Sequence, residues 1–356
     1  MNIPFSTPVA NHGKKVRSSN MELFRIVAMF LVLVVHADYF SLKGPETSDF
    51  LTSPFASMTR VFFESLSIGC VDMFILLSGW FGIRPKVKGL AGFIYQCLFF
   101  MCGIYVVCLA AGVAPFSPKI LFNEVMFKSY WFITAYIALY LLSPVLNAFV
   151  QKSSEKELRW FLVCFYSFEL IYSWFARSAT FFMNGYSTLS FIGLYMLARY
   201  LRLYPNKLTQ RSGWFDLGVF MGIVVLQAAV LSATTAAGLP TATAWVFSYE
   251  SPLVVASSAY LLLFFSKLDF QSKLVNVIGK SSFAVYLFHQ EPRLCSLYFV
   301  PFVRHIYGDY SGIACLGVMF LFLLGVFALA VLVDRIRLRT WNLLGAYLSQ
   351  WPWFNA

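Results

Sequence analysis

The sequence predicts an all-α, polytopic integral membrane protein with about ten transmembrane helices and both termini in the cytoplasm. Three observations lead to this fold class: the composition, the length of the apolar runs and the distribution of basic residues between them. Of the 356 residues, 59% are hydrophobic and 12% are charged, with a mean hydropathy of +0.71. Soluble domains carry roughly 25% charged residues, so the composition excludes a soluble globule, a disordered chain and a nucleic-acid-binding protein.

Ten apolar runs are long enough, at about 20 residues, to cross the hydrocarbon core of a bilayer as helices. Their apolar residues are continuous, whereas the strands of a membrane barrel alternate between apolar and polar positions. The predicted spans cover residues 22–41, 61–82, 91–113, 129–150, 158–177, 184–201, 214–235, 243–266, 281–303 and 311–334. The sixth span is short, and Pro292 and Pro301 interrupt the ninth.

Basic residues alternate between the two sides of these spans. Of the 27 Lys and Arg residues, nineteen fall in segments on the side of the N-terminus, six fall on the other side, and Arg25 and Arg293 lie within or at the edge of spans. Cytoplasmic loops carry the excess of Lys and Arg, so we expect both termini inside the cell. The net charge of +11 is therefore a topology signal and not a surface for polyanions.

The expected organisation is a single membrane domain with two tails. A cytoplasmic N-terminal tail covers residues 1–20, the membrane domain covers 21–340, and a cytoplasmic C-terminal tail covers 341–356. The seven cysteines are scattered, mostly within spans and without a CxxC pair, which predicts buried apolar side chains. We expect neither a metal site nor a disulfide framework.

Ionisable groups inside a bilayer are costly and are therefore functional candidates. Of the four histidines, His12 in the N-terminal tail and His305 in an outer loop are explained by solvation, whereas His36 and His289 lie inside predicted spans. The acids within or near the spans are Asp38, Glu64, Asp72, Glu169, Glu250 and Glu291.

Arg25 and His36 share one face of the first span, because eleven residues cover about 16 Å and close to three full turns. A cation on the cytoplasmic side of an imidazole suits a path along which an anionic cofactor enters from inside. The alternative is that Arg25 snorkels to the interface and His36 hydrogen-bonds a neighbouring helix. In the second span, Asp72 needs a partner, and a histidine on an adjacent helix would give a base–orienter pair. Ser78 and Gly79 would let helix backbones approach closely.

Four motifs follow one another along the chain: Arg25-x10-His36, VDMFILLSGW (71–80), SYWFITAYIALYLLSPVL (129–146) and GKSSFAVYLFHQEP (279–292). Together they resemble the membrane acyltransferase-3 family, whose members O-acylate cell-surface glycans. The chain length and the ten-helix plan also match that family. One departure is Trp80-Phe81 after the Ser-Gly pair, where a smaller aromatic or aliphatic residue is commoner.

The resemblance implies a set of site residues. His36 corresponds to the catalytic histidine, Asp72 to the acid associated with it, and Arg25 to the arginine on the acyl-CoA side of the path. The residues expected to bind substrate are Ser78, Trp131, Tyr136, Tyr140, Tyr286, His289 and Glu291.

The implied reaction moves an acyl group from cytoplasmic acyl-CoA to a hydroxyl of a cell-surface or lipid-linked glycan. Acetyl is the expected group, with succinyl as the alternative, and the expected location is the inner (plasma) membrane of a bacterial cell envelope. No permanently bound cofactor is expected; the partners are acyl-CoA, the glycan acceptor and membrane lipids. The acceptor and the oligomeric state stay open.

Two other functions are alternatives to acyl transfer. A secondary transporter or flippase of a glycan intermediate would show paired repeats with broken helices in matching halves, and no such pairing occurs in the sequence. A glycan polymerase commonly carries a large outer loop, and the longest predicted outer loop here has only about twenty residues.

Overall fold

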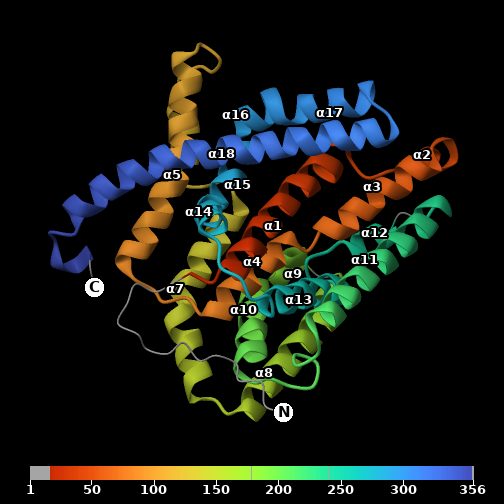
Figure 1. The fold of residues 1–356 in the computed structure, drawn as a ribbon, viewed down its shortest axis with the longest axis horizontal. Coiled ribbons are helices and arrows are strands. Elements are labelled where there is room, and N and C mark those ends of the chain that lie inside the picture. The colour runs from red at the N-terminus through yellow and green to blue at the C-terminus, as the bar shows by residue number, and fades with distance from the viewer. Residues whose placement is uncertain (1–16, 178, 240, 355–356) are drawn as a thin grey trace.

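The computed structural model describes residues 17–177, 179–239 and 241–354, and every regular element in these ranges is helical (Figure 1). Residues 1–16, with His12 and most of the predicted N-terminal tail, lie outside the described residues, as do 355 and 356. The α-helices are α1 (Ser19–Val35), α2 (Thr47–Thr52), α3 (Pro54–Ser67), α4 (Cys70–Phe81), α5 (Val87–Ala110), α6 (Pro118–Val125), α7 (Trp131–Lys152), α8 (Glu155–Phe168), α9 (Ala179–Phe182), α10 (Thr188–Leu203), α11 (Gly213–Ala236), α12 (Thr241–Val246), α13 (Pro252–Ser266), α14 (Lys273–Ser281), α15 (Phe283–His289), α16 (Pro292–Leu294), α17 (Val300–Asp309) and α18 (Gly312–Leu348). The π-helical stretches are η1 (His36–Phe40), η2 (Glu169–Phe175) and η4 (Cys295–Phe299), and the 3₁₀ turns are η3 (Met183–Gly185) and η5 (Pro352–Phe354).

Six helical segments of the described ranges are long and apolar enough to cross a membrane. They are Ser19–Phe40, Pro54–Phe81, Val87–Ala110, Trp131–Lys152, Gly213–Ala236 and Gly312–Leu348. These segments coincide with the first, second, third, fourth, seventh and tenth predicted spans. The all-helical membrane class is therefore confirmed, whereas the count of ten spans and the cytoplasmic termini stay predictions.

The other four predicted spans are shorter or broken helices. Residues 158–177 form α8 and the π-helical η2, and residues 184–201 form α10, which has 16 residues. Residues 243–266 divide into α12 and α13, and Pro252 begins the second helix, a position where the missing N–H of proline leaves no intrahelical hydrogen bond unmade. Pro292 and Pro301 likewise stand at the starts of α16 and α17.

Helix α18 is longer than a membrane is thick. Its 37 residues extend about 55 Å, against about 30 Å of hydrocarbon. The helix continues to Leu348, into the segment predicted as a C-terminal tail, and runs across most of the molecule in Figure 1. Large apolar side chains such as Phe320, Leu321 and Leu332 are exposed along it, as expected for a surface covered by lipid.

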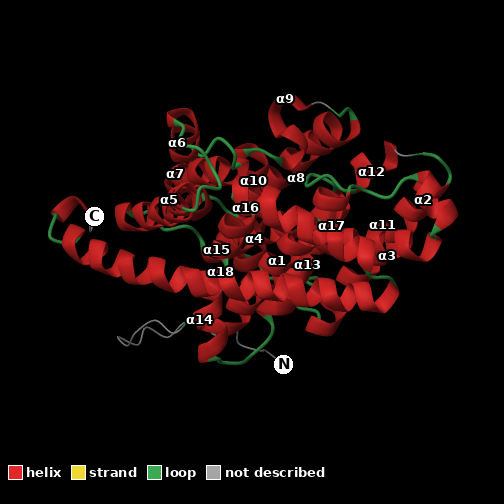
Figure 2. Cartoon of the chain, turned by 90° about the horizontal axis from the view of Figure 1, so that it is seen from above, coloured by secondary structure: helices red, strands yellow, loops and turns green. Residues whose placement is uncertain are grey.

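Helix α1 lies at the centre of the bundle and contacts α3, α4, α13, α14, α15 and α18 (Figures 1 and 2). Its fully buried side chains, such as Phe24 and Leu33, belong to the main hydrophobic core. The crossing of α4 and α10 depends on Gly79, because a Cβ there would lie 2.4 Å from the backbone oxygen of Tyr195. The close approach predicted at Gly79 is confirmed, and it fixes α4 beside the core that holds α1.

Candidate active site

A cavity of about 480 Å³ lies where the C-terminal end of α1, the start of α4 and the start of α7 meet. Cavities of this size hold small-molecule ligands and usually combine apolar walls with a few polar groups. The lining residues are Met29, Val32, Val35, His36, Tyr39, Phe40, Glu64, Ile68, Cys70, Val71, Phe74, Ser129, Trp131, Phe132, Tyr186, Tyr249, Phe283, Tyr286 and Gln290. Three predicted site residues are therefore on its wall: His36, Trp131 and Tyr286.

A second hollow of about 530 Å³ lies between α8, α10 and α13. Its lining is almost entirely apolar and includes none of the predicted site residues, although Glu169 and Glu250 border it. The smaller cavity is the better candidate for chemistry because a histidine lies on its wall.

His36 begins the π-helical stretch η1, directly after the last residue of α1. Short π-helical stretches occur frequently at functional sites. The Nδ1 atom of His36 lies 2.7 Å from Nε2 of His289 and 2.8 Å from Nε2 of the Gln290 amide. His289 is the last residue of α15 and Gln290 follows it, so one short segment supplies both contacts to the His36 ring.

The hydrogen bonds of His289 define the tautomer of this pair. Nδ1 of His289 lies 2.5 Å from the carbonyl oxygen of Val285, which can only accept, so Nδ1 carries a proton. His289 is 1% exposed, and burial favours the neutral ring, whose Nε2 then accepts. This contact favours the tautomer in which Nδ1 of His36 carries the shared proton and Nε2 accepts, whereas the Gln290 amide nitrogen, as placed 2.8 Å from the same Nδ1, favours the opposite one. A half-turn of the Gln290 amide, which exchanges its oxygen and nitrogen, makes that residue compatible with the first tautomer.

The structure does not pair Asp72 with His36. Asp72 is fully buried in the first turn of α4, and neither of its carboxylate oxygens has a hydrogen-bond partner in the described structure. The carboxylate that acts on it electrostatically is Glu169 at the start of η2. The predicted pair of His36 and Asp72 does not form in this structure, and the ring that lies within hydrogen-bond distance of His36 is His289.

Arg25 lies on α1 as predicted, but its guanidinium is already partnered. Its Nη1 lies 2.7 Å from Oε2 of Glu22, while Oε1 of Glu22 accepts from Nη1 of Arg17 at 2.9 Å. Arg25 does not border the cavity and is partly exposed, with 28% of its side-chain surface accessible. It lies in the first half of α1, where Arg17 shares its Glu22 partner, and His36 follows the other end of this helix.

The aromatic residues of α7 divide into two groups. Trp131 lies on the cavity wall, and its ring centroid is 4.4 Å from that of Tyr186. Tyr136 stacks on Phe132 outside the lining, with its hydroxyl 3.4 Å from Oγ of Ser78.

Tyr140 lies further along α7 and holds the backbone of Lys86 at the start of α5. Its hydroxyl accepts from Lys86 N at 2.9 Å and donates to Lys86 O at 3.0 Å. Ser78, Tyr136 and Tyr140 are therefore in helix contacts in this structure and not on the cavity wall.

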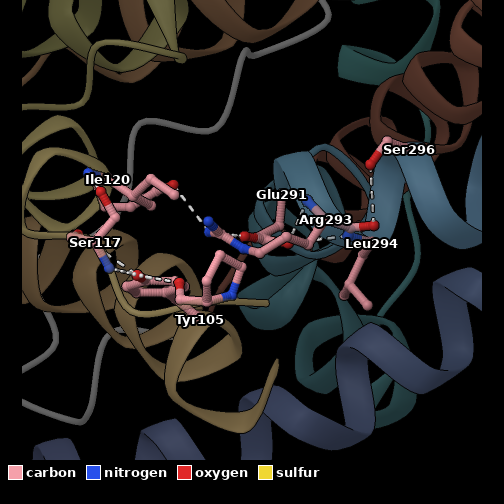
Figure 3. Close-up of polar contacts among 9 residues, drawn as sticks. Tyr105, Ser117, Ile120, Glu291, Arg293, Leu294 and Ser296 are labelled. Atoms are coloured by element: carbon pink, nitrogen blue, oxygen red, sulfur yellow. Dashed lines mark hydrogen bonds and ion pairs between the residues drawn. The ribbon is translucent and has the colours of Figure 1, made fainter. Parts of the chain in front are cut away.

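Glu291 lies in a buried ion-pair network (Figure 3). Its Oε2 accepts from the backbone N–H groups of Arg293 and Leu294, at 2.9 and 3.0 Å, and so caps α16. Its carboxylate also pairs with the Arg293 guanidinium, which lies 2.9 Å from Glu124 Oε1 and 4.6 Å over the Tyr105 ring. This network accounts for Glu291 without a ligand, in contrast to the expected substrate contact.

Sequence reasoning missed Gln290, Tyr186, Tyr249 and Glu64 as cavity residues. Gln290 had a detectable signal, since a polar residue directly follows His289 in the late span. Glu64 stood out in the sequence only as an embedded acid near the outer boundary. Tyr186 and Tyr249 gave no signal, because tyrosines are frequent near membrane boundaries and these two are brought together only by folding.

A helical membrane protein with a buried histidine pair beside a cavity of small-molecule size fits the class of membrane-embedded group-transfer enzymes. Comparison with protein families identifies the group: residues 18–335 match the model of the family described as "Acyltransferase domain". The chain belongs to this family, the membrane acyltransferase-3 family, and is an acyltransferase. Neither the curated proteins nor the solved structures gave a match.

Proposed function

We propose that the protein transfers an acyl group, acetyl or alternatively succinyl, from acyl-CoA to a hydroxyl of a cell-surface or lipid-linked glycan at the inner membrane. The observation that carries the proposal is His36 on the cavity wall, with its Nδ1 2.7 Å from Nε2 of His289, an arrangement in which Nε2 of His36 would accept a proton. A neutral imidazole fixed in this tautomer is a general base for a hydroxyl. Family membership supports group transfer over transport.

The reaction needs one proton transfer in each direction. Nε2 of His36 takes the proton of the acceptor hydroxyl as its oxygen attacks the thioester carbonyl. The C–S bond then breaks, the ester remains on the acceptor, and the imidazolium returns the proton to the CoA thiolate. Tyr286 lines the same cavity, and its hydroxyl is the candidate donor to the tetrahedral oxyanion that forms before the C–S bond breaks.

In this scheme the nucleotide portion of acyl-CoA binds on the side of the bundle that carries Arg25. Arg199 and Arg202 lie near one another on α10, and the Arg202 guanidinium is 5.1 Å over the Trp80 ring. Neither arginine is in an ion pair of the described residues, so their charge is available to phosphates. The pantetheine arm would then extend along α1 toward His36. No permanently bound cofactor is required by this scheme.

The test is incorporation of label from [¹⁴C]acetyl-CoA into the glycan fraction of membranes that contain the protein. We expect label that mild alkali releases, as an ester requires, and none in membranes without the protein. Mass spectrometry of the same glycan would give the acceptor and the acyl group. Absence of alkali-labile label with both acetyl-CoA and succinyl-CoA would contradict the proposal.

His289 is a positioning residue in this scheme, and its replacement separates orientation from binding. We expect His289→Phe, which fills the space without an acceptor, to lower kcat by roughly 10²-fold or more with little change in the KM for acyl-CoA. His289→Gln retains an acceptor for the His36 Nδ1 proton and should recover part of the rate. Equal losses in both variants, or a loss confined to KM, would contradict an orienting role.

A further inference from the structure

Glu64 is a buried acid on the wall of the His36 cavity that lacks a counter-ion. It lies on α3 with 2% of its surface exposed, and its Oε2 has no hydrogen-bond partner in the described structure. A buried carboxylate oxygen without a partner is unfavourable by about 1–3 kcal/mol or more, unless a ligand satisfies it. The feature therefore points to something that binds there.

The charged residues near Glu64, Arg60 and Asp38, form an ion pair with each other. Arg60 Nε lies 2.7 Å from Asp38 Oδ1, and the guanidinium also donates to the carbonyl oxygen of Lys43 and covers the Tyr307 ring at 5.3 Å. Glu64 is in none of the ion pairs of the described residues.

The Arg60–Asp38 pair also has a geometric consequence. Asp38 lies on η1 two residues after His36, and Arg60 lies one helical turn before Glu64 on α3. The ion pair thus ties the stretch that carries His36 to the face of α3 that carries Glu64. The Arg60–Asp38 ion pair therefore helps to hold His36 and Glu64 on the same cavity, although neither His36 nor Glu64 takes part in it.

Three aromatic rings make another part of the wall. Trp131 lies 4.4 Å from Tyr186 and stacks on Tyr249 at 6.2 Å with an interplanar angle of 27°, and the two tyrosines are 5.0 Å apart. These residues come from α7, the turn before α10 and the segment before α13, so only the fold assembles them. Flat aromatic faces beside a hydrogen-bond acceptor suit a sugar ring, whose C–H face is apolar and whose edge carries hydroxyls.

The charge of the lining restricts the sugar further. Among the described residues that line the cavity there is no Lys or Arg, and the titratable acids and bases are His36, Glu64, Cys70 and the tyrosines. A uronic acid or a phosphorylated sugar would bring a negative charge next to the Glu64 carboxyl, and the nearby cation, Arg60, is already paired with Asp38.

We propose, on the basis of the proposed function, that Glu64 and the wall formed by Trp131, Tyr186 and Tyr249 bind an uncharged sugar ring of the acceptor. Glu64 accepts a hydrogen bond from a hydroxyl other than the one that His36 deprotonates, and the aromatic wall takes the apolar face of the ring. Glu64 is then a specificity residue that fixes which hydroxyl reaches Nε2 of His36.

The test measures sugar binding without the acyl donor. The full-length protein, purified in a detergent without a sugar head group, is heated with methyl glycosides of glucose, galactose and their N-acetylamino forms. Methyl glucuronide supplies a negative charge and methyl glucosaminide an ammonium group. We expect at least one neutral glycoside to raise the thermal midpoint, and Glu64→Ala to weaken its Kd by roughly 10- to 100-fold. Glu64→Gln should weaken it less.

Asp269→Asn is the matched control, since it removes a carboxylate from an exposed position. It should bind the neutral glycoside as the unmodified protein does. The proposal is overturned if no neutral glycoside shifts the midpoint, if the glucuronide binds equally well, if the glucosaminide binds more tightly, or if Glu64→Ala leaves binding unchanged. Sugar binding without acyl transfer in the labelled acetyl-CoA assay would refute the proposed function alone. Acyl transfer without Glu64-dependent binding would refute this assignment alone.

Discussion

Replacing His36 with alanine is expected to abolish acyl transfer while the protein still folds and inserts. General bases contribute about 10²–10⁴-fold to rates, and alanine removes both the base and the group that His289 orients, so we expect a loss of about 10³-fold or more. The measurement is label transfer from acetyl-CoA to membrane glycan, with the amount of folded protein determined by size-exclusion chromatography in detergent.

His305→Ala is the control for the loss of an imidazole. The His305 side chain is 66% exposed and, among the residues that the structure describes, forms an ion pair with Asp309 at 3.2 Å, so its removal should leave activity and folding unchanged. Full activity in His36→Ala would refute the assignment of the base. Equal losses in His36→Ala and His305→Ala would show that the effect does not come from the cavity.

Replacing Arg293 with methionine is expected to cause the largest loss of stability among the charged residues considered. Glu124 and Glu291 are 3% and 0% exposed, and methionine would leave both carboxylates buried without a cation. Breaking a buried ion pair from one side costs about 3–5 kcal/mol. The thermal midpoint in detergent and the folded yield should both fall sharply.

A compensated variant separates the charge effect from a packing effect. Glu124→Gln and Glu291→Gln, combined with Arg293→Met, remove all three charges, and the amide oxygen that replaces the Glu291 carboxylate can still cap α16. This triple variant should recover most of the lost midpoint, whereas Lys119→Ala, at an exposed position of α6, should change nothing. If the triple variant is no more stable than Arg293→Met alone, the network is not what stabilises this region.

The variant Glu291→Gln distinguishes a structural role of Glu291 from a role in substrate binding. The sequence motif led us to expect a substrate contact, whereas the structure gives Glu291 a helix cap and an arginine. These roles predict different results for Glu291→Gln: the structural role lowers the midpoint, and a substrate contact would raise the acceptor KM at unchanged stability. The structure favours the first result.

The regular features of the sequence were predictable because each depends on local or averaged properties. Continuous apolar runs identify membrane helices from a window of about 20 residues, and six of the ten are long helices of the expected kind. The eighth and ninth spans are broken where Pro252, Pro292 and Pro301 stand in the first turns of new helices, although Pro144 lies within the continuous α7. Motif order indicated the family, which the match over residues 18–335 confirms.

The pairing of side chains was not predictable in the same way. Asp72 was the predicted partner of His36 and His289 was predicted to bind substrate, since each is an embedded polar residue on another span and the sequence does not show which one faces His36. The difference is rotational: His289 faces His36 from the end of α15, whereas Asp72 is near Glu169. A helix turns about 100° per residue, so small changes in how two helices meet decide which side chains touch.

The sequence by itself determined that this is a helical membrane acyltransferase with an embedded histidine on its first helix. Those properties follow from composition, periodicity and motifs within single segments. Only the tertiary structure decided that His36 is held by His289 and Gln290, and that Glu64 shares its cavity with Trp131. These contacts join residues far apart in the chain, and their geometry depends on the packing of whole helices and not on any local pattern.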